Sequence, residues 1–487
     1  MAKRVCVIDI GSNSIRMVVY EKTSRFSFHL LHEAKSKVRI SEHAYQNGGN
    51  LQEIPMQRTF EALKDFLTIS NSLKARKILC VATSALRDAP NKQIFLKQIK
   101  NELKLNIKII DGVKEAYFGA IACANLLPEQ TNALSIDIGG GSTEFSIIDH
   151  KDVSHTLSTK LGTVRLKELF FDTNDLQGAI AYIDKQLAVL DDLAPTTLIG
   201  IGGTFRALSS AIMIKNCYPL KKLHAYEFSV KEFENFIALI LAADEKKLFE
   251  MGIEKNRFDI IKPGSLILDR VLKKISFHNI ITSGVGVREG VYLSDLLRNS
   301  KAKLPTNYNT SVRYLLDTHI HNKSYSNQLN KLSKDLFDIT YEYLGIDARY
   351  RYELSVAAKL YPIGTSIHYY SANKHSYTLV KNALEYGFTH KNIILVATLI
   401  KFARKRLPSL LHIEKYQELL PDSKTVNALS YLISITVALL SHRPNNIDFN
   451  LEFNNGVLFI KSSEKLYLSR DAIKKIDSIE NLKIDFL

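Results

Sequence analysis

The chain of 487 residues is best understood from Asp137-Ile138-Gly139-Gly140-Gly141-Ser142-Thr143. This stretch follows a short apolar run, Ala133–Ile136, and precedes another, Phe145–Ile148, so it has the context of a turn between two strands. Glycines let backbone N–H groups approach a phosphate closely, and an aspartate at the end of a buried strand can hold a divalent cation directly or through water. The stretch therefore predicts a strand–turn–strand phosphate cradle.

The same pattern occurs earlier, as Asp9-Ile10-Gly11-Ser12-Asn13-Ser14 between the strand-like runs Val5–Ile8 and Arg16–Tyr20. An isolated Asp-x-Gly is weak evidence, because most such sequences are ordinary turns. Two copies in matching strand contexts, one domain apart, instead predict two similar domains that face each other across a cleft.

Apolar runs typical of buried strands alternate with helical periodicity over roughly the first 300 residues, which predicts an α/β fold. Strands are expected at Met17–Tyr20, Phe26–Leu31, Ile78–Ala82 and Ile107–Ile110, and helices over 53–73 and 92–103. The polar stretch 299–305 indicates a linker, and residues 308–440 have mostly helical periodicity. Asn455-Gly456 between two apolar runs predicts a terminal hairpin.

The composition is that of a globular protein, with 46% hydrophobic and 24% charged residues, which excludes a disordered chain. The 65 Lys and Arg against 50 Asp and Glu give a formal charge of +15, which favours polyanionic partners. The four cysteines form no CxxC pair, the N-terminal apolar run ends at Asp9, and the most apolar stretch, 431–440, is half the ~20 residues that span a membrane. These features predict a cytoplasmic protein with reduced thiols and no membrane contact.

Two further glycine turns follow strand-like runs, at Gly200-Ile201-Gly202-Gly203-Thr204 and at Gly284-Val285-Gly286. Together with the two Asp-x-Gly turns, they resemble the phosphate-1, phosphate-2 and adenosine loops of the actin-like ATPase superfamily, which includes sugar kinases, acetate kinase and heat-shock chaperones. The resemblance implies two ribonuclease-H-like domains around a phosphate-binding cleft.

Six short sequence blocks, taken in their order along the chain, point to one family within this superfamily. They are Ala82–Ala89, Asp111–Ala116, Asp137–Glu144, Lys160–Leu166, Gly202–Leu208 and Arg257–Gly264. Over residues 4–295 this set is similar to the exopolyphosphatase / guanosine pentaphosphate phosphohydrolase (Ppx/GppA) family. The resemblance implies an α/β fold with actin-like domain I at 1–125 and actin-like domain II at 126–300. A mostly α-helical, HD-like domain would follow at 306–440, and a small α+β element at 441–487.

The family removes the terminal phosphate of inorganic polyphosphate, or the 5′-γ-phosphate of guanosine pentaphosphate, by attack of water with a divalent metal in the cleft. The resemblance implies the same activity, on either substrate or both, with Mg²⁺ as the cofactor and Mn²⁺ as the alternative. It assigns Glu115 as the general base, Glu144 to placing the attacking water, and Arg87 to gripping the transferred phosphate. Asp137, Glu144 and Asp9 would hold the metal.

Phosphate contacts are expected from hydroxyl groups, backbone N–H groups and cations in these blocks. They are Ser12, Asn13, Ser14, Gly139, Gly140, Gly141, Ser142, Thr143, Gly202, Gly203, Thr204, Arg16, Lys160, Arg165, Arg206 and Arg257. Purely structural roles stay open as alternatives. Glu115 in the first turn of a helix would complement the macrodipole, Arg87 could pair with Asp88, and the basic residues could form a solvated face.

The helical part resembles the HD metal-dependent phosphohydrolases, whose chemistry needs paired His-Asp ligands. Where related chains read Leu-His-Asp or Leu-His-Glu, this one reads Leu360-Tyr361-Pro362, so the central ligand pair is absent. The remaining histidines are interpreted as structural or polyanion-facing: His319, His321, His368 and His375. This part is expected to extend a polyphosphate channel, to support dimerisation, or both.

Three other functions compete with hydrolysis. An actin-like-fold kinase would need ATP and an acceptor pocket, and the blocks around Arg87 and Glu115 argue against it. A sensor that binds polyphosphate, guanosine pentaphosphate or guanosine tetraphosphate without turnover is the non-catalytic alternative. Nucleic acid is disfavoured, because the 22 Tyr and 23 Phe form no basic motif interleaved with aromatics. A homodimer and a part in the stringent response are expected from the family.

Overall fold

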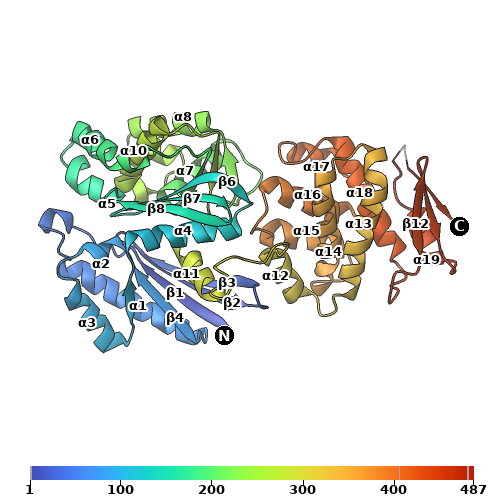
Figure 1. The fold of residues 1–487 in the computed structure, drawn as a ribbon, viewed down its shortest axis with the longest axis horizontal. Coiled ribbons are helices and arrows are strands. Elements are labelled where there is room, and N and C mark those ends of the chain that lie inside the picture. Colours follow the sequence, from blue (N-terminus) through green and yellow to red (C-terminus); the bar gives the residue numbers. More distant parts are fainter. Residues whose placement is uncertain (1–2, 405, 480–481) are drawn as a thin grey trace. The chain divides into compact units, whose positions relative to one another are not determined.

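In the computed structural model, two sheets of the same pattern form the framework of residues 1–308 (Figure 1). The first has the strand order β3-β2-β1-β4-β5. Its strands are β1 (Arg4–Ile10), β2 (Ile15–Lys22), β3 (Phe28–Ser36), β4 (Lys77–Ala82) and β5 (Ile107–Ile109). The first three form an antiparallel meander, and β4 and β5 continue the sheet in parallel with β1. The β-branched run Val5–Ile8 is buried on both faces, as a central strand requires.

The second sheet repeats this pattern. Its order is β10-β11-β9-β6-β7-β8, and its strands are β6 (Gln130–Ile138), β7 (Thr143–His150), β8 (Asp152–Thr159), β9 (Thr197–Ile201), β10 (Tyr226–Phe228) and β11 (Asn279–Thr282). Strands β6, β7 and β8 form the meander, β9 and β11 are parallel to β6, and β10 is an additional antiparallel edge. The two Asp-x-Gly turns join equivalent strands, β1 to β2 and β6 to β7, so the predicted duplication is confirmed.

Helices cover both sheets. They are α1 (Glu53–Ser72), α2 (Ser84–Asp88), α3 (Lys92–Leu103), α4 (Gly112–Leu126), α5 (Thr163–Leu166), α6 (Leu176–Leu187), α7 (Gly202–Lys215), α8 (Val230–Ala242), α9 (Glu245–Glu250), α10 (Phe258–Lys274) and α11 (Val287–Leu296), with the short η1 (Tyr45–Asn47), η2 (Lys167–Phe171), η3 (Ala188–Leu190) and η4 (Lys255–Arg257). Helix α4 packs against β7 and β8 of the second sheet, whereas α11 packs against α4 and against β1 of the first. Helix α4, which follows the first sheet in the chain, thus packs on the second sheet, and α11, which follows the second sheet, packs on the first.

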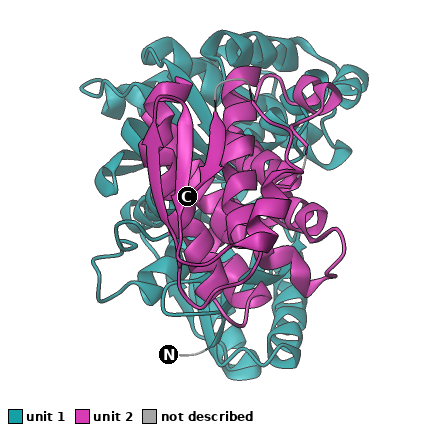
Figure 2. Cartoon of the chain, turned by 90° about the vertical axis from the view of Figure 1, so that its right-hand side faces the viewer, with its two compact units in different colours: residues 1–308 teal, residues 309–487 magenta. Residues whose placement is uncertain are grey.

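Residues 309–487 form a second compact unit, coloured separately in Figure 2. Its helices are α12 (Thr310–His319), α13 (Ser324–Leu344), α14 (Arg351–Leu360), α15 (Ala372–Ala383), α16 (His390–Phe402), α17 (Leu410–Lys415), α18 (Ser423–Leu439) and α19 (Tyr467–Ile473), with η5 (Ala348–Tyr350) and η6 (Tyr361–Ser366). A small sheet contains β12 (Asn450–Asn454), β13 (Val457–Lys461) and β14 (Lys483–Phe486). The predicted hairpin is present, since β12 and β13 pair in antiparallel fashion on either side of Asn455-Gly456. Both turn residues have positive φ, 46° and 80°, as a two-residue hairpin turn requires.

The structure describes residues 3–404, 406–479 and 482–487. Within these ranges, no helix combines the length and the apolar character needed to cross a bilayer.

Candidate active site

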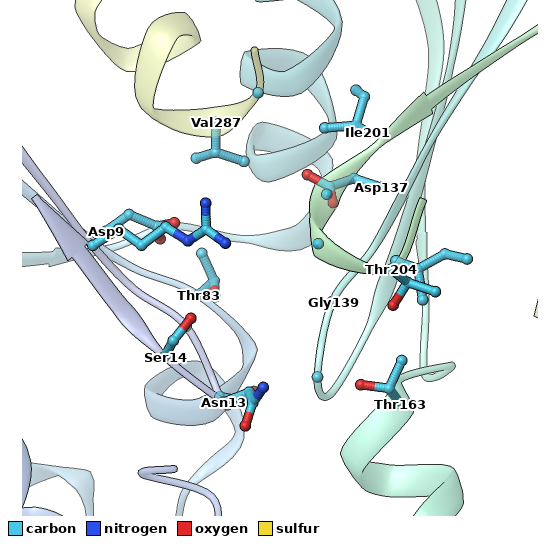
Figure 3. Close-up of a pocket in the computed structure, with 18 of the residues that line it drawn as sticks. Asp9, Asn13, Ser14, Thr83, Asp137, Gly139, Thr163, Ile201, Thr204 and Val287 are labelled. Carbon is cyan, nitrogen blue, oxygen red and sulfur yellow. The ribbon is translucent and has the colours of Figure 1, made fainter. Parts of the chain in front are cut away.

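The two Asp-x-Gly turns lie on opposite walls of one pocket of about 370 Å³. Figure 3 shows residues of both walls: Asp9, Asn13 and Ser14 from the first sheet, and Asp137, Gly139 and Thr204 from the second. Each turn is closed by a backbone hydrogen bond of the same kind, from Gly11 N to Ser14 O at 3.3 Å and from Gly139 N to Ser142 O at 2.9 Å. The sequence repeat thus builds a cleft with two similar walls.

Glu115 lies in the first turn of α4, whose N-terminus is capped by Asp111 accepting from the Lys114 N–H at 2.7 Å. Its carboxylate faces the pocket and accepts a 2.9 Å hydrogen bond from Nη1 of Arg87. Arg87 belongs to α2, which follows β4 closely, and its Nη2 donates to Oγ of Ser142 on the facing turn at 3.4 Å. Arg87 therefore links the candidate base on one wall to the phosphate turn on the other.

Four carboxylates share the pocket: Glu115 and Glu144 are buried, and Asp9 and Asp137 are half-buried. Burial raises the pKa of Asp137 to about 6 and that of Glu144 to about 8. It also raises the pKa of Asp9 and of Glu115 above their ordinary values. Repulsion from Glu144 raises the pKa of Glu115 further, whereas Arg87 lowers it. Raised pKa values make these groups stronger proton acceptors near neutral pH, and make their anions dependent on neighbouring cations.

The donor set of the pocket fits a divalent cation. Oδ1 of Asp9 is buried without a hydrogen-bond partner among the described residues, and Asp137 lines the same pocket. In the part of the chain that the structure describes, no group of three or more His, Cys, Asp or Glu side chains forms a complete metal site. Mg²⁺ is commonly held by one or two carboxylates together with substrate phosphates and water. These acids therefore fit an ion shared with a phosphate ligand.

Glycine is required where the loops approach the acids and each other. Gly202 has a φ of +88°, and a Cβ at this position would lie 2.4 Å from Oδ1 of Asp137. A Cβ on Gly140 would lie 2.8 Å from Cβ of Ser12 on the opposite turn. Side chains at these two positions would displace Asp137 or separate the two walls.

A group of cations lines another part of the pocket. The predicted residues among them are Arg16, Arg206 and Arg257, and the structure adds Lys35, Lys37 and Arg288, which sequence reasoning missed. Burial, followed by repulsion from neighbouring arginines, lowers the pKa of Arg206 to about 10 and that of Lys35 to about 8. Crowded and partly desolvated cations are stabilised by an anion, so this part of the pocket favours phosphate groups.

The sequence offered one local signal for the missed cations, the glycine turn just before Arg288, whereas Lys35 is placed in the pocket by strand pairing. Lys35 is the register partner of Arg16 across β2 and β3, and directly paired residues share one face of a sheet. Arg288 follows the Gly284–Gly286 turn by two residues, is 7% exposed, and donates to Oε1 of Glu33 at 2.7 Å. Further missed pocket residues lie inside or beside the six blocks: Thr83, Ser84, Thr163 and Asn256.

Some predicted site residues do not line the pocket of the described structure: Arg87, Gly141, Ser142, Thr143, Lys160 and Arg165. The Thr143 hydroxyl donates to the backbone oxygen of Leu161 at 2.8 Å. Arg165 donates from Nε to the Gly141 backbone oxygen at 2.9 Å and pairs with Asp88 at 3.2 Å. Its guanidinium therefore stabilises the glycine turn 139–142 and does not line the pocket. The Lys160 side chain is exposed. Phosphate contacts by these residues stay predictions.

Comparison with known proteins gives the family of the chain. A model of the Ppx/GppA phosphatase family matches residues 18–299. The chain belongs to the Ppx/GppA phosphatase family. A model of domain III of the same Ppx/GppA phosphatases matches residues 309–475, within the helical unit. The predicted family, fold class and hydrolase class are thereby confirmed.

Similar proteins with phosphatase, pyrophosphatase or exopolyphosphatase names agree with the assignment of this chain to the Ppx/GppA family. It is 26% identical over 417 residues to a guanosine-5′-triphosphate,3′-diphosphate pyrophosphatase of Photobacterium profundum, covering 83% of this chain and 81% of that protein. It is 31% identical over 294 residues to a bifunctional 3-dehydroquinate synthase/phosphatase of Fusobacterium nucleatum, a match that spans 57% of this chain and 44% of that protein. The crystal structure of an exopolyphosphatase from Cytophaga hutchinsonii is similar with a TM-score of 0.57 and 26% identity, covering 62% of this chain and 100% of that one.

Proposed function

We propose that this phosphatase removes the terminal phosphate of linear inorganic polyphosphate, the 5′-γ-phosphate of guanosine pentaphosphate, or both. The observation that supports this most directly is the 2.9 Å contact between Arg87 and Glu115, beside a pocket formed by two phosphate turns. Hydrolysis of a phosphoanhydride needs a group that accepts a proton from water and a cation that stabilises the transferred phosphate. The names of a pyrophosphatase relative and an exopolyphosphatase neighbour support the two substrates.

In the proposed reaction, Glu115 accepts a proton from a water molecule while the water oxygen bonds to the terminal phosphorus. The bond from phosphorus to the bridging oxygen breaks, its electron pair stays with the shortened chain, and inorganic phosphate leaves. Burial and the charge of Glu144 raise the pKa of Glu115, which suits it to this role. Arg87 would pair with two phosphoryl oxygens and stabilise the charge that develops on them.

Mg²⁺, or Mn²⁺ in its place, would be held by Asp137 and Asp9, directly or through water, with Glu144 beside them. When bound, the ion supplies positive charge to the phosphate oxygens. The unpartnered Oδ1 of Asp9 supports this assignment. Glu144 accepts a 2.9 Å hydrogen bond from Oγ of Ser158, which holds its carboxylate in one orientation and favours a role in placing the water.

The phosphates behind the terminal one would lie against the cationic part of the pocket. Arg16, Arg206 and Arg257 are proposed to bind them, and the formal charge of +15 favours a long anion in general. The affinity for polyphosphate should then fall steeply with salt, as counterion release does for nucleic acids.

The remaining family-level expectations are also proposals. They are a homodimer, a cytoplasmic location, a part in the stringent response, and the domain division 1–125, 126–300, 306–440 and 441–487. The nucleotide named for the pyrophosphatase relative supports the stringent-response assignment.

Phosphate release from long-chain polyphosphate and from guanosine pentaphosphate, measured in parallel with Mg²⁺, tests the proposal. We expect Glu115→Ala to lower the rate by about 10²-fold or more, and Glu102→Ala, on the exposed end of α3, to leave it unchanged. The ratio of the two wild-type rates identifies the preferred substrate. Tight binding of both ligands without phosphate release would overturn the proposed hydrolase activity in favour of a sensor. Transfer of phosphate from ATP to an acceptor, without hydrolysis of either substrate, would favour a kinase.

A further inference from the structure

Tyr45 lies where the two phosphate turns approach each other, although it does not line the 370 Å³ pocket of the described structure. A Cβ on Gly141 of the second turn would overlap the Tyr45 hydroxyl. The same Cβ would lie 2.8 Å from Oγ of Ser84 and 3.1 Å from Oγ of Ser12. Three hydroxyl groups of one wall therefore surround a glycine of the other.

The Tyr45 hydroxyl is connected to the pocket through Ser12. Ser12 and Ser84 both line the pocket, and their Oγ atoms are 3.1 Å apart. Tyr45 forms side-chain hydrogen bonds with Ser12 and Ser41, and burial raises its pKa, so the phenol keeps its proton. When Tyr45 donates to Ser12, the proton of Ser12 itself is left for Ser84 or for a phosphate oxygen. Tyr45 can thus orient the Ser12 hydroxyl.

The opposite wall holds Tyr45 by its ring and by its backbone. Cζ of Arg165 lies 4.4 Å from the centre of the Tyr45 ring, and Nε of Arg165 donates to the Gly141 backbone oxygen at 2.9 Å. Oε2 of Glu168 accepts from the Tyr45 N–H at 3.3 Å, and Oε1 accepts from the His43 N–H at 3.0 Å. Cation–π contacts and hydrogen bonds to a carboxylate are both strengthened by charge. The tyrosine is therefore fixed to the wall that carries the second turn.

The loop before this tyrosine is bound to the first turn and also to the opposite wall. The backbone N–H of Arg39 donates to the Asn13 oxygen at 3.0 Å, and that of Ser41 donates to the Ser12 oxygen at 3.3 Å. Nη2 of Arg39 pairs with Oδ2 of Asp259, in α10, at 2.7 Å. Because the loop contacts both walls, it sets the spacing of the two phosphate turns.

We propose that Tyr45 is a positioning residue of the reaction, which acts through the Ser12 hydroxyl and through the spacing of the two turns. The inference rests on the proposed function, in which the transferred phosphate lies between these turns. Ser12 would donate a hydrogen bond to an oxygen of that phosphate, and Tyr45 itself would touch no reacting atom. A donor aimed at the charge that develops during transfer raises kcat more than it tightens substrate binding.

Tyr45→Phe in the full-length protein removes the hydroxyl and keeps the ring beside Arg165. We expect kcat for phosphate release from tripolyphosphate with Mg²⁺ to fall about fivefold to tenfold, and KM to change less. Tyr377→Phe, in the helical unit, is the matched control. The Tyr377 hydroxyl also bonds to another hydroxyl, that of Tyr416 at 3.2 Å, and Nζ of Lys401 lies 5.0 Å from the centre of the Tyr377 ring. This control should keep the wild-type kcat.

Ser12→Ala, alone and combined with Tyr45→Phe, tests the route through Ser12. If Tyr45 acts through Ser12, Tyr45→Phe has little further effect on kcat once the Ser12 hydroxyl is gone. A general folding defect would not depend on Ser12 in this way. Wild-type kcat in Tyr45→Phe, or losses that simply multiply in the double variant, would overturn the proposal.

Calorimetric titration with tripolyphosphate separates this inference from the proposed function. Wild-type protein that binds tripolyphosphate and releases no phosphate would contradict the hydrolase but not the role of Tyr45. The same set of variants is then compared by its Kd for tripolyphosphate. A Kd of Tyr45→Phe that is raised only while Ser12 is present would support the role, and a Kd equal to that of the wild type would overturn it. Absence of both binding and release would overturn both proposals.

Discussion

Nη1 of Arg87 donates a 2.9 Å hydrogen bond to Oε2 of Glu115, and the two residues come from different helices, α2 and α4. This contact stabilises the Glu115 anion against the burial and the Glu144 repulsion that raise its pKa. The same guanidinium reaches Ser142 on the opposite turn. One side chain thus joins the candidate base to the candidate phosphate site, and a substitution there should affect both.

Arg87→Ala is expected to lower kcat/KM for phosphate release by about 10²–10³-fold. The variant loses the cation that stabilises the transferred phosphate, and the pKa of Glu115 should rise further because its partner is gone. Arg87→Lys should restore only part of the activity, since an ammonium lacks the planar fork. Arg76→Ala, an exposed arginine before β4, serves as the control. An Arg87→Ala variant with unchanged kcat and only a higher KM would contradict the transition-state role.

Gly202→Ala is expected to abolish most activity, and Gly252→Ala is its matched control. Both glycines have positive φ, +88° and +84°, so both substitutions carry the same backbone cost, about 1 kcal/mol. A Cβ at Gly202 would lie 2.4 Å from Oδ1 of Asp137, whereas at Gly252 the nearest atom is Cδ1 of Ile214 at 3.4 Å. Unfolding temperatures and release rates of the two variants separate stability from activity. Equal rates in both would show that the Gly202 turn does not position Asp137.

Asp137→Asn should raise the Mg²⁺ concentration that gives half-maximal release by about tenfold or more, because an amide is a weaker ligand than a carboxylate. The rate at saturating Mg²⁺ should fall less than the rate at low Mg²⁺. Asp65→Asn, on the exposed face of α1, should leave the titration curve unchanged. The assignment of Asp137 to the metal fails if both variants and the wild type share one Mg²⁺ dependence.

The fold could be predicted from the sequence because its signals are local. An apolar run followed by Asp-x-Gly and a second apolar run specifies strand, turn and strand within fifteen or so residues, and the pattern occurs twice. The helix expected over 92–103 has these bounds in the structure, and the Asn455-Gly456 hairpin forms as expected. Each of these elements is determined by neighbours in the chain.

Membership of the pocket could be predicted only in part, because it depends on contacts between distant segments. Arg288 lines the pocket because α11 returns to the first sheet, where it meets Glu33 of β3. Arg165 has the expected local context, yet its guanidinium is held by Asp88 and the Gly141 oxygen. No local periodicity encodes either relationship.

His412 of the helical unit is a buried histidine whose contacts define its protonation. Nζ of Lys401 lies 3.2 Å from Nδ1, and since an ammonium only donates, Nδ1 must accept. Nε2 then carries the proton and donates to Oγ1 of Thr398 at 2.8 Å. Burial, followed by repulsion from Lys401 and Lys415, lowers the pKa of His412 from 6.5 to about 4.

The stability of the protein should therefore depend on pH through His412. The unfolded chain binds a proton at this residue first, so the stability that neutral His412 confers is complete above pH 6.5 and is lost as the pH falls toward 4. Between pH 8 and pH 5 this loss is at most about 2 kcal/mol. His412→Gln should flatten the pH dependence of the unfolding transition by this amount, whereas His321→Gln, an exposed histidine of the same unit, should leave the wild-type slope. The opposite sign, a wild type that gains stability relative to His412→Gln on acidification, would mean that Nδ1 is protonated in the folded protein.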